Sequence, residues 1–426
     1  MTGADTDADL LSRRARALGP TYVLFYDEPL HIVRAEGVWM FDAQGRRYLD
    51  AYNNVPVVGH CHPHVVDELA RQARTLNTHT RYLGEQPLAL AEKLLATFPP
   101  VIGNVVYACT GSEANDLAVR ISKAVTGGTG FIVTDYAYHG TTDVIAGMSP
   151  EDGAPLGPGV YAVAPPLGPE GAAAFGDRVR RCIEAMRADG VRPAALLVDT
   201  IFSSDGIAVD PPGFLAAAVA EIRAAGGLFI ADEVQPGFGR TGSHMWGFQR
   251  HGVVPDLVTM GKPMGNGHPI SALAARPALL DAFARRTRYF NTFGGNSVAC
   301  AVALAVLEVI ERERLLANAR ASGEHLREGL MRLASRYPWV REVRGAGLFV
   351  GVELAAPGPD GPAPPGTRRT ARQEAARVVN DLKRRGVLVG TTAREANVLK
   401  IRPPLTIARS EVDLILDALD QSLAAG

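Results

Sequence analysis

The sequence predicts an α/β fold in which a large, doubly wound, mostly parallel sheet is joined to a smaller α+β domain. Short apolar runs such as 194–198 and 228–231 are typical of strands buried on both faces of a sheet. Helical segments separate these runs, as expected of strand–helix–strand units. Hydrophobic residues make up 47% of the 426 residues, which is ample for a packed core.

Composition and charge argue against several classes of protein. The formal net charge is −1, so no basic excess favours nucleic-acid binding. No apolar run reaches the length of about 18 residues that a membrane span needs, and the first 20 residues lack a signal-peptide core. The four cysteines are widely spaced and form no CxxC pair, which is typical of reduced thiols. We therefore expect a cytoplasmic protein.

The N-terminal segment, residues 1–50, is predicted to belong to the smaller domain. It should contain a short amphipathic helix over 10–18 and then an antiparallel meander broken by turn residues. The strands of this meander are expected at 32–33, 38–41 and 48–49. Pro63 then suits the first turn of a helix over 63–76.

The large domain is predicted over residues 51–305. Strand and helix patterns alternate from residue 105 onward, and a Gly/Pro-rich stretch at 153–169 is expected at the surface. The strands are expected at 105–110, 131–135, 194–200, 228–231 and 257–260, and the helices at 111–124, around Cys182 and Met186, and at 213–225.

The C-terminal small domain is predicted over residues 306–426. A long Ala/Leu-rich helical pattern begins at 298 and continues in broken form to 333. Further helices are expected at 371–385 and 409–423, and strands at 341–343, 347–354, 387–389 and 398–401. The Pro/Gly-rich residues 355–370 are expected to form a mobile loop.

Two strand ends carry reactive side chains. Asp232 follows the run 228–231, and Lys262 follows the run 257–260. The functional groups of such sheets collect at the carboxyl ends of the strands, so both side chains are expected to face one cleft. A lysine amine and a carboxylate suit pyridoxal phosphate (PLP), whose aldehyde needs an amine and whose ring nitrogen needs an acidic partner. Taken singly, a buried salt bridge and a solvated lysine would also explain these two residues.

Three glycine-rich or loop segments add to this cleft. Gly111 and Ser112 open a helix after a strand, and free helix amides with a hydroxyl can bind a phosphate, although Ser112 could equally be an ordinary N-cap. Tyr138 follows a strand end and could stack on a planar ring. Thr292 precedes a Gly-Gly turn that offers a second phosphate contact.

A metal site is a less favoured alternative. His60, His62 and His64 alternate along the chain, which is a spacing that could bring imidazoles together. No nearby carboxylate or fourth ligand completes a ligand set, so an irregular loop that leads into a helix explains them as well. We therefore expect no metal.

Together the segments TGSEAND, YHG, FIADEVQPGFGRTG, MGKPMGNGHP and FNTFGGN resemble those of class III aminotransferases of PLP fold type I. The resemblance extends from about Tyr22 to Leu405. It implies that Lys262 carries the internal aldimine and moves the proton at the substrate Cα, while Asp232 pairs with the pyridinium nitrogen. The implied cofactor-binding residues are Gly111, Ser112, Tyr138, His139, Asp199, Asp232, Val234, Gln235, Lys262 and Thr292. Because Thr292 would reach the neighbouring subunit's cofactor, the resemblance also implies a homodimer with shared active sites.

The chain departs from the ornithine-aminotransferase-like pattern at the substrate side. Ser204 stands where those members have a gating glutamate, and Lys400 stands where they have the arginine that binds the α-carboxylate. A lysine is a point charge without the planar fork of arginine. Further cationic candidates are Arg81 and Arg276, which surface positions would also explain. The expected substrate-binding residues are Tyr22, Phe25, Asn53, Ser204, Lys400 and Arg402.

Other segments, among them GHCHP, YFNTFGGN and VLKIRPP, resemble class III alanine–glyoxylate aminotransferases and amino alcohol phosphate phospho-lyases. The predicted function is transfer of an amino group between a small ω- or β-amino compound and an oxo acid, through the Lys262 aldimine and pyridoxamine phosphate. The alternative is a PLP-dependent phospho-lyase acting on a substrate such as O-phosphoethanolamine. A non-catalytic protein with this fold is a third reading, which the intact set of Lys262, Asp232 and Ser112 argues against.

Overall fold

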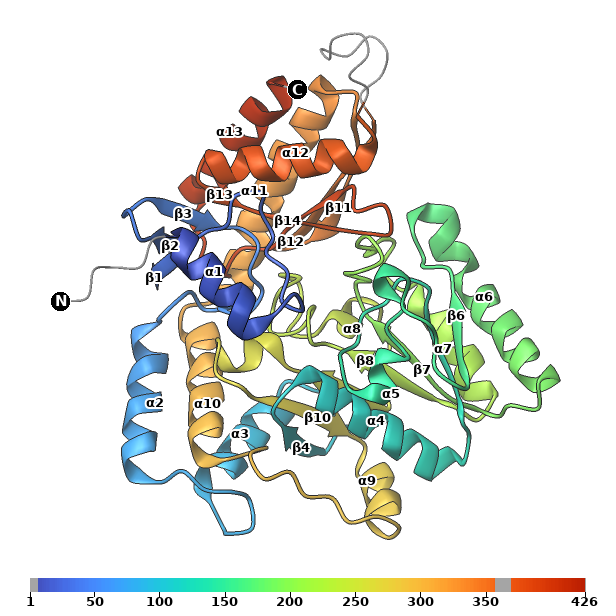
Figure 1. Ribbon diagram of the computed structural model, residues 1–426. Helices are drawn as coiled ribbons and strands as arrows, with labels where there is room; N and C mark the ends of the chain where they lie inside the picture. Colours follow the sequence, from blue (N-terminus) through green and yellow to red (C-terminus); the bar gives the residue numbers. More distant parts are fainter. Residues whose placement is uncertain (1–6, 357–368, 426) are drawn as a thin grey trace.

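The structure is a computed structural model that describes residues 7–356 and 369–425 (Figure 1). The loop predicted at 355–370 therefore lies almost wholly outside the described residues. A large domain built on a seven-stranded sheet carries a smaller domain to which both ends of the chain contribute.

The large sheet is mostly parallel, as predicted. Its strand order is β4-β10-β9-β8-β7-β5-β6, and only β10 runs antiparallel to its neighbours. The strands are β4 (Asn104–Ala108), β5 (Gly130–Thr134), β6 (Val160–Val163), β7 (Pro193–Asp199), β8 (Leu228–Asp232), β9 (Leu257–Met260) and β10 (Ser271–Ala275).

Both faces of this sheet are buried, which explains the continuous apolar runs. In β7, Leu196 and Val198 point to one core and Ala195 and Leu197 to the other, because successive side chains of a strand alternate. One face is covered by α4 (Gly111–Thr126), α5 (Asp143–Ala146) and α9 (Pro277–Ala284). The other is covered by α6 (Gly168–Ala188), α7 (Leu215–Ala224), α3 (Glu85–Leu95) and α10 (Ser297–Arg312).

Two strands of the sheet were not predicted. β6 lies inside the Gly/Pro-rich stretch that was expected to be a surface loop, and it is the edge strand beside β5. β10 has the sequence SALAA, which lacks the branched and aromatic side chains that favour strands. It is a strand because it fills the space between β4 and β9, and all five of its residues are buried. The helices α3, α5 and α9 were also missed.

The small domain is built on a four-stranded antiparallel sheet of order β11-β12-β15-β14. Its strands are β11 (Val340–Ala346), β12 (Phe349–Leu354), β14 (Gly390–Thr392) and β15 (Val398–Ile401). The apolar faces of α11 (Leu315–Arg336), α12 (Ala371–Arg384) and α13 (Arg409–Ala424) join the core beside this sheet (Figure 1). The strand predicted at 387–389 is present as β13 (Val387–Leu388), which pairs with β3, whereas β14 directly after it was not predicted and pairs with β15 in the other sheet.

The N-terminal meander is present as predicted, after α1 (Asp7–Leu18). β1 (Ile32–Glu36), β2 (Trp39–Asp42) and β3 (Arg47–Asp50) pair antiparallel, and β13 adds to β3 in parallel. The chain then enters α2 (Pro63–Thr75). The predicted domain boundaries stay predictions, and the one at residue 305 falls inside the continuous helix α10. Among the described helices, none has the length and apolarity to cross a membrane.

Candidate active site

The strand register brings the predicted site residues together. Asp199 at the end of β7 lies opposite Asp232 at the end of β8, and Asp232 lies opposite Thr259 on β9. Lys262 follows β9 at the start of a short 3-10 turn, η2 (Lys262–Gly265). The carboxyl ends of three neighbouring parallel strands therefore deliver two carboxylates and one amine to the same edge of the sheet.

These side chains line one cavity. Nine of the ten residues expected to bind the cofactor border it, and the tenth, Thr292, does not. Gly140, which was not predicted, completes the lining. The residues around the cavity are Gly111, Ser112, Tyr138, His139, Gly140, Asp199, Asp232, Val234, Gln235 and Lys262.

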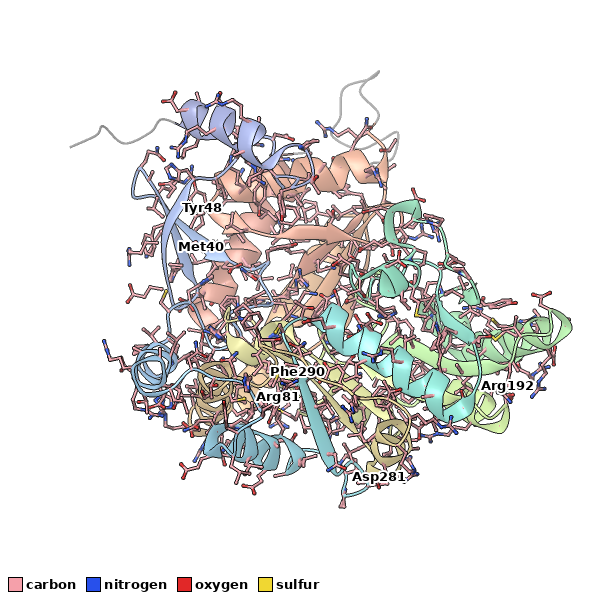
Figure 2. All side chains as sticks on the ribbon, turned by 60° about the horizontal axis from the view of Figure 1, so that its bottom comes forward. Met40, Tyr48, Arg81, Arg192, Asp281 and Phe290 are labelled. Carbon is pink, nitrogen blue, oxygen red and sulfur yellow. The ribbon has the colours of Figure 1, made fainter. Side chains whose placement is uncertain are left out.

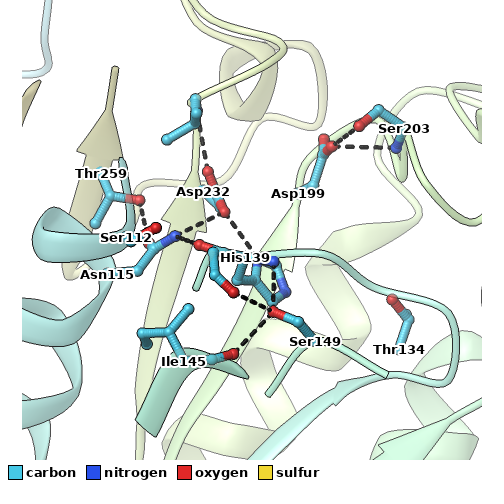
Figure 3. Close-up of polar contacts among 12 residues, drawn as sticks. Ser112, Asn115, Thr134, His139, Ile145, Ser149, Asp199, Ser203, Asp232 and Thr259 are labelled. Atoms are coloured by element: carbon cyan, nitrogen blue, oxygen red, sulfur yellow. Dashed lines mark hydrogen bonds and ion pairs between the residues drawn. The ribbon is translucent and has the colours of Figure 1, made fainter. Parts of the chain in front are cut away.

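Asp232 is held in a fixed orientation by three donors (Figure 3). Its Oδ2 accepts from Asn115 Nδ2 at 3.0 Å and from His139 Nδ1 at 2.7 Å, while its Oδ1 accepts from the Val234 amide at 3.0 Å. Because an ionised carboxylate can only accept, the His139 proton in this pair lies on Nδ1. Thr259 Oγ1 donates to Asn115 Oδ1 at 2.6 Å and so fixes the amide in turn. Buried carboxylates need such partners.

Gly111 and Ser112 at the start of α4 line one part of the cavity, which we call the cup of α4. The Thr110–Glu113 capping box occupies part of the first turn, and the amides of Gly111 and Ser112 have no acceptor within the helix. Ser112 is therefore not the N-cap, which is Thr110. Gly140 packs directly against Ser112, because a Cβ on Gly140 would lie 2.3 Å from Ser112 Oγ. Gly140 also has a φ of +139°, which favours glycine.

Lys262 lies beside an aromatic ring in a desolvated setting. Its Nζ is 5.8 Å from the centroid of the Tyr138 ring. Burial lowers the pKa of Lys262, the charge of Arg402 lowers it further, and Asp232 and Asp199 oppose the shift. A lowered pKa increases the fraction of neutral amine, which is the form that attacks a carbonyl carbon.

The residues around the cavity fit pyridoxal phosphate. The cup of α4 suits its phosphate, and Asp232 suits its ring nitrogen. His139 lines the same cavity, and its buried Nε2 has no hydrogen-bond partner among the described residues. When bound, the cofactor supplies an aldehyde carbon and an electron-withdrawing ring. The chain supplies the Lys262 amine, which can add to the carbonyl and carry a proton to and from the substrate Cα.

Two buried cations, Arg402 and Lys400, lie near the cavity without bordering it, and their surroundings differ. The guanidinium of Arg402 is already engaged, since it donates to Gln235 Oε1 and, at 2.7 Å, to the Tyr52 carbonyl. Lys400 is equally buried, yet its ammonium has no carboxylate within 4.0 Å in the described part of the chain. Burial, followed by the charge of Arg402, lowers the pKa of Lys400 to about 7.

Several predicted residues lie away from the cavity in the single chain. Thr292 is exposed. Phe25 packs edge-on against Tyr52 and borders a neighbouring pocket with Asn53, while Tyr22 is exposed. Their assignment to substrate or cofactor stays a prediction.

The two further arginine candidates have other partners. Arg276 forms an ion pair with Asp256 at 3.2 Å, and Arg81 lies over the ring of Phe290 at 3.9 Å. Neither residue borders the cavity, and a substrate role for either stays a prediction.

The three alternating histidines do not converge. His60 contacts Asp50 at 2.7 Å, His62 contacts Glu313 at 3.1 Å and His64 contacts Glu308 at 2.7 Å. Within residues 7–356 and 369–425, no group of three or more metal-ligating side chains comes together. Each imidazole instead ties its loop or helix to a different acidic side chain.

Three contributors to the site were missed. Asn115 and Thr259 orient Asp232, and the charge of Glu151 acts on both Lys262 and Lys400. Asn115 carries a usable signal, since it is a polar residue on the buried, mostly apolar face of α4. Glu151 carries none, because it lies in an irregular, Gly/Pro-rich stretch that gives no sign of where its side chain points.

Known proteins share this arrangement. The family model described as "Aminotransferase class-III" matches residues 25–423. The chain belongs to the class III aminotransferase family. Members of this family are PLP-dependent transaminases, so the chain is a PLP-dependent enzyme of the transaminase class, as its sequence predicted.

The chain is similar to relatives that are named for two different activities. It is 37% identical to an alanine–glyoxylate aminotransferase 2-like protein of Drosophila melanogaster, over 98% of this chain and 87% of the relative. It is 36% identical to a mitochondrial alanine–glyoxylate aminotransferase 2 homologue of Arabidopsis thaliana, over 99% and 88% of the two chains. It is 42% identical to a phospholyase from Arthrobacter solved in complex with phosphoethanolamine, with a TM-score of 0.92 over 98% and 100% of the chains.

Proposed function

We propose that this class III aminotransferase moves an amino group from a small ω- or β-amino compound that bears an acidic group to a small oxo acid. The observation that carries the proposal is the convergence of Lys262, Asp232 and Ser112 on one cavity. Two buried cations lie beside it, since Arg402 donates to the lining residue Gln235 and Lys400 stands two residues earlier on the chain. Lys262 is the amine that bonds to the cofactor and then moves the Cα proton. Asp232 keeps the ring nitrogen protonated, and Gly111 with Ser112 binds the phosphate.

The test is a half-reaction. Loaded enzyme mixed with an amino donor and no oxo acid should convert its cofactor to the amine form once per subunit and then stop. Adding pyruvate or glyoxylate should restore the starting absorbance and release the aminated product. Turnover that continues without any oxo acid would contradict the transaminase proposal for that donor.

A second candidate is a phospho-lyase acting on an amino alcohol phosphate. Lys400 and Ser204 favour it, because the site lacks the planar arginine fork and the neighbouring glutamate that suit an α-carboxylate. The similar Arthrobacter phospholyase, solved with phosphoethanolamine, supports the same reading. With O-phosphoethanolamine, a lyase would release inorganic phosphate through many turnovers and keep its starting absorbance. A transaminase would release none.

We further propose a homodimer with shared active sites. Tyr82, Leu83, Leu88 and Phe290 border one apolar groove and are largely exposed in the single chain. Figure 2 shows Phe290 on this face beside Arg81, and the exposed Thr292 follows two residues later. Exposed apolar grooves of this kind are typical of subunit interfaces.

Complementation tests the shared site. In a mixed dimer of Lys262→Ala and Thr292→Ala chains, one site loses both residues and the other regains both. Co-expressed variants should therefore recover activity at one site per mixed dimer, although each variant alone is impaired. Monomeric behaviour on sedimentation, or no recovery in the mixed dimer, would refute the arrangement.

The cytoplasm is the proposed compartment. All four cysteines are free thiols in the structure, which suits a reducing environment. The similar Arabidopsis thaliana protein carries a mitochondrial name, so fractionation of cells that express the full chain is the deciding measurement. Recovery with an organelle would contradict the proposal.

A further inference from the structure

Arg402 is a buried arginine whose position the surrounding residues fix. Its main-chain amide donates to the Ala51 carbonyl at 2.8 Å, and its Nε donates to the Tyr52 carbonyl at 2.7 Å. The centres of the Tyr52 and Phe349 rings lie 4.8 Å and 5.7 Å from the guanidinium carbon. Nη1 donates to Gln235 Oε1. The guanidinium is therefore held between the end of β15 and the loop that follows β8.

These contacts leave Arg402 poorly suited to clamp a substrate carboxylate. A guanidinium binds a carboxylate best through two nitrogens on one edge. One edge joins Nε and Nη2 and the other joins Nη1 and Nη2, so each edge has one nitrogen already bound to a protein oxygen. Within the described part of the chain, no carboxylate lies within 4.0 Å of the guanidinium. The positive charge of Arg402 is thus not neutralised by an ion pair there and can act on an anionic group in the cavity.

The contact with Arg402 fixes the direction of the Gln235 amide. A guanidinium can only donate, so the Gln235 atom that meets it must be the amide oxygen, Oε1. The amide nitrogen, Nε2, therefore carries its two protons away from Arg402, and none of the described residues accepts from it. Gln235 lines the cavity, and Asn54 Nδ2 holds its main-chain carbonyl at 2.9 Å. Its side chain thus offers a hydrogen-bond donor to a ligand in the cavity.

The other polar groups of pyridoxal phosphate already have partners in the cavity. The ring nitrogen suits Asp232, the phosphate suits the cup of α4, and the aldehyde carbon bonds to the Lys262 amine. The ring oxygen beside the aldehyde is the polar group that remains. An oxygen with anionic character accepts strongly from an N–H group, so Gln235 Nε2 is a donor of the right kind for it.

We propose that Arg402 is a positioning residue for the cofactor: it orients the Gln235 amide as a donor to the ring oxygen, and its positive charge favours the anionic form of that oxygen. A neighbouring charge polarises a hydrogen bond, so this donor is stronger than that of an unpaired glutamine. The role concerns the resting, cofactor-loaded enzyme, so it goes beyond the choice of amino compound. Arg402 thus acts on the cofactor through Gln235, and not on the substrate.

A double-mutant cycle on cofactor binding tests this link. Apoenzyme titrated with PLP should bind it about tenfold more weakly after Arg402→Met and about tenfold more weakly after Gln235→Leu. Because Arg402 acts through Gln235, the double variant should also lose about tenfold, and not the roughly hundredfold loss expected of independent residues. A hundredfold loss in the double variant would overturn the proposal.

Arg344→Met is the matched control for the cycle. This part-buried arginine also donates to a main-chain carbonyl of the large domain, that of Gly206 at 2.6 Å, yet it forms no hydrogen bond with a residue that lines the cavity. Its replacement should change the Kd for PLP less than about twofold. A loss equal to that of Arg402→Met would show that the effect is structural and would overturn the proposal.

Gln235→Glu separates the donor from the folding of the site. A glutamate of the same shape still accepts from Arg402 Nη1, but its carboxylate offers no proton to the ring oxygen. This variant should therefore keep a melting temperature within about 3 °C of wild type and bind PLP about tenfold more weakly. Unchanged affinity would show that no donor is needed at this position and would overturn the proposal.

The resting spectrum distinguishes a cofactor role from a substrate role. Losing the charge and the oriented donor makes the Lys262-bound cofactor easier to protonate, so the pH midpoint of its visible absorbance should rise by about one unit in Arg402→Met. The other titratable groups that line the cavity are unchanged in this variant, namely Tyr138, His139, Asp199 and Asp232. An unchanged midpoint would overturn the proposal. These titrations use no amino substrate, so they decide the role of Arg402 even if the proposed transamination fails.

Discussion

Replacing Asp232 by asparagine removes a negative charge from the cavity with almost no change of shape. The carboxylate accepts from Asn115, His139 and the Val234 amide, so it is oriented before the cofactor arrives. Its interaction with a ring cation about 4 Å away contributes ~4 kcal/mol at an effective dielectric constant near 20. Losing most of that stabilisation during Cα deprotonation should lower kcat by ~10²- to 10³-fold.

The assay separates chemistry from binding. Cofactor content is read by absorbance, and the rate of the half-reaction is measured at saturating amine. Asp199→Asn is the matched control, because Asp199 lies opposite Asp232 in the sheet register but accepts from the Ile201 amide and from Ser203 (Figure 3). That variant should lose ~1–3 kcal/mol of stability and less than about tenfold in rate. Loaded Asp232→Asn enzyme with a rate within about fivefold of wild type would refute the assigned role.

Three further predictions concern neighbouring residues. Lys262→Ala should lower kcat by more than ~10³-fold, and borohydride should no longer fix the cofactor to the chain, as mass spectrometry would show; retained labelling would identify another lysine. Gly140→Ala should weaken cofactor binding by at least about tenfold in titrations of the apoenzyme, because the added Cβ would lie 2.3 Å from Ser112 Oγ and push it aside. An unchanged Kd would exclude Ser112 from the cup. Because burial lowers the pKa of Lys400 to about 7, affinity for an acidic substrate should be full below pH 7 and fall about tenfold per pH unit above it. Lys400→Arg should flatten that profile. A flat wild-type profile would contradict the role of Lys400.

Where the sequence pattern is strong and local, it predicted the fold correctly. Both faces of the sheet are covered, so β7 and β8 need apolar residues at successive positions, and such continuous runs can be recognised in the sequence. β10 was not predicted because alanine and serine have no strong preference for a strand. The segment SALAA is a strand only because it pairs with β4 on one side and β9 on the other. β14 was missed for a related reason, since its three residues Gly-Thr-Thr carry no apolar run and form a strand only by pairing with β15.

The residues of the candidate site likewise include some that local sequence patterns reveal and others that only the tertiary structure reveals. Asp232 and Lys262 could be recognised because each ends an apolar run, and strand ends meet at one edge of a parallel sheet. Asn115 was passed over inside a motif that explains helix capping well, although its burial on an apolar helix face is a signal. Arg402 was expected at the substrate, yet its guanidinium binds Gln235 and the Tyr52 carbonyl, which are distant in sequence.

The sequence by itself determined the class of chemistry: an amine, a carboxylate and a helix N-terminus in the order and setting that PLP requires. Those features are local, because each depends on a strand end or a helix start that neighbouring residues specify. The tertiary structure alone decided how the loop of Ser204 meets the strands beside Lys400. Thr392 Oγ1 donates to the Ser204 carbonyl at 3.1 Å, and only the packing of the small domain against the large sheet brings these two segments together.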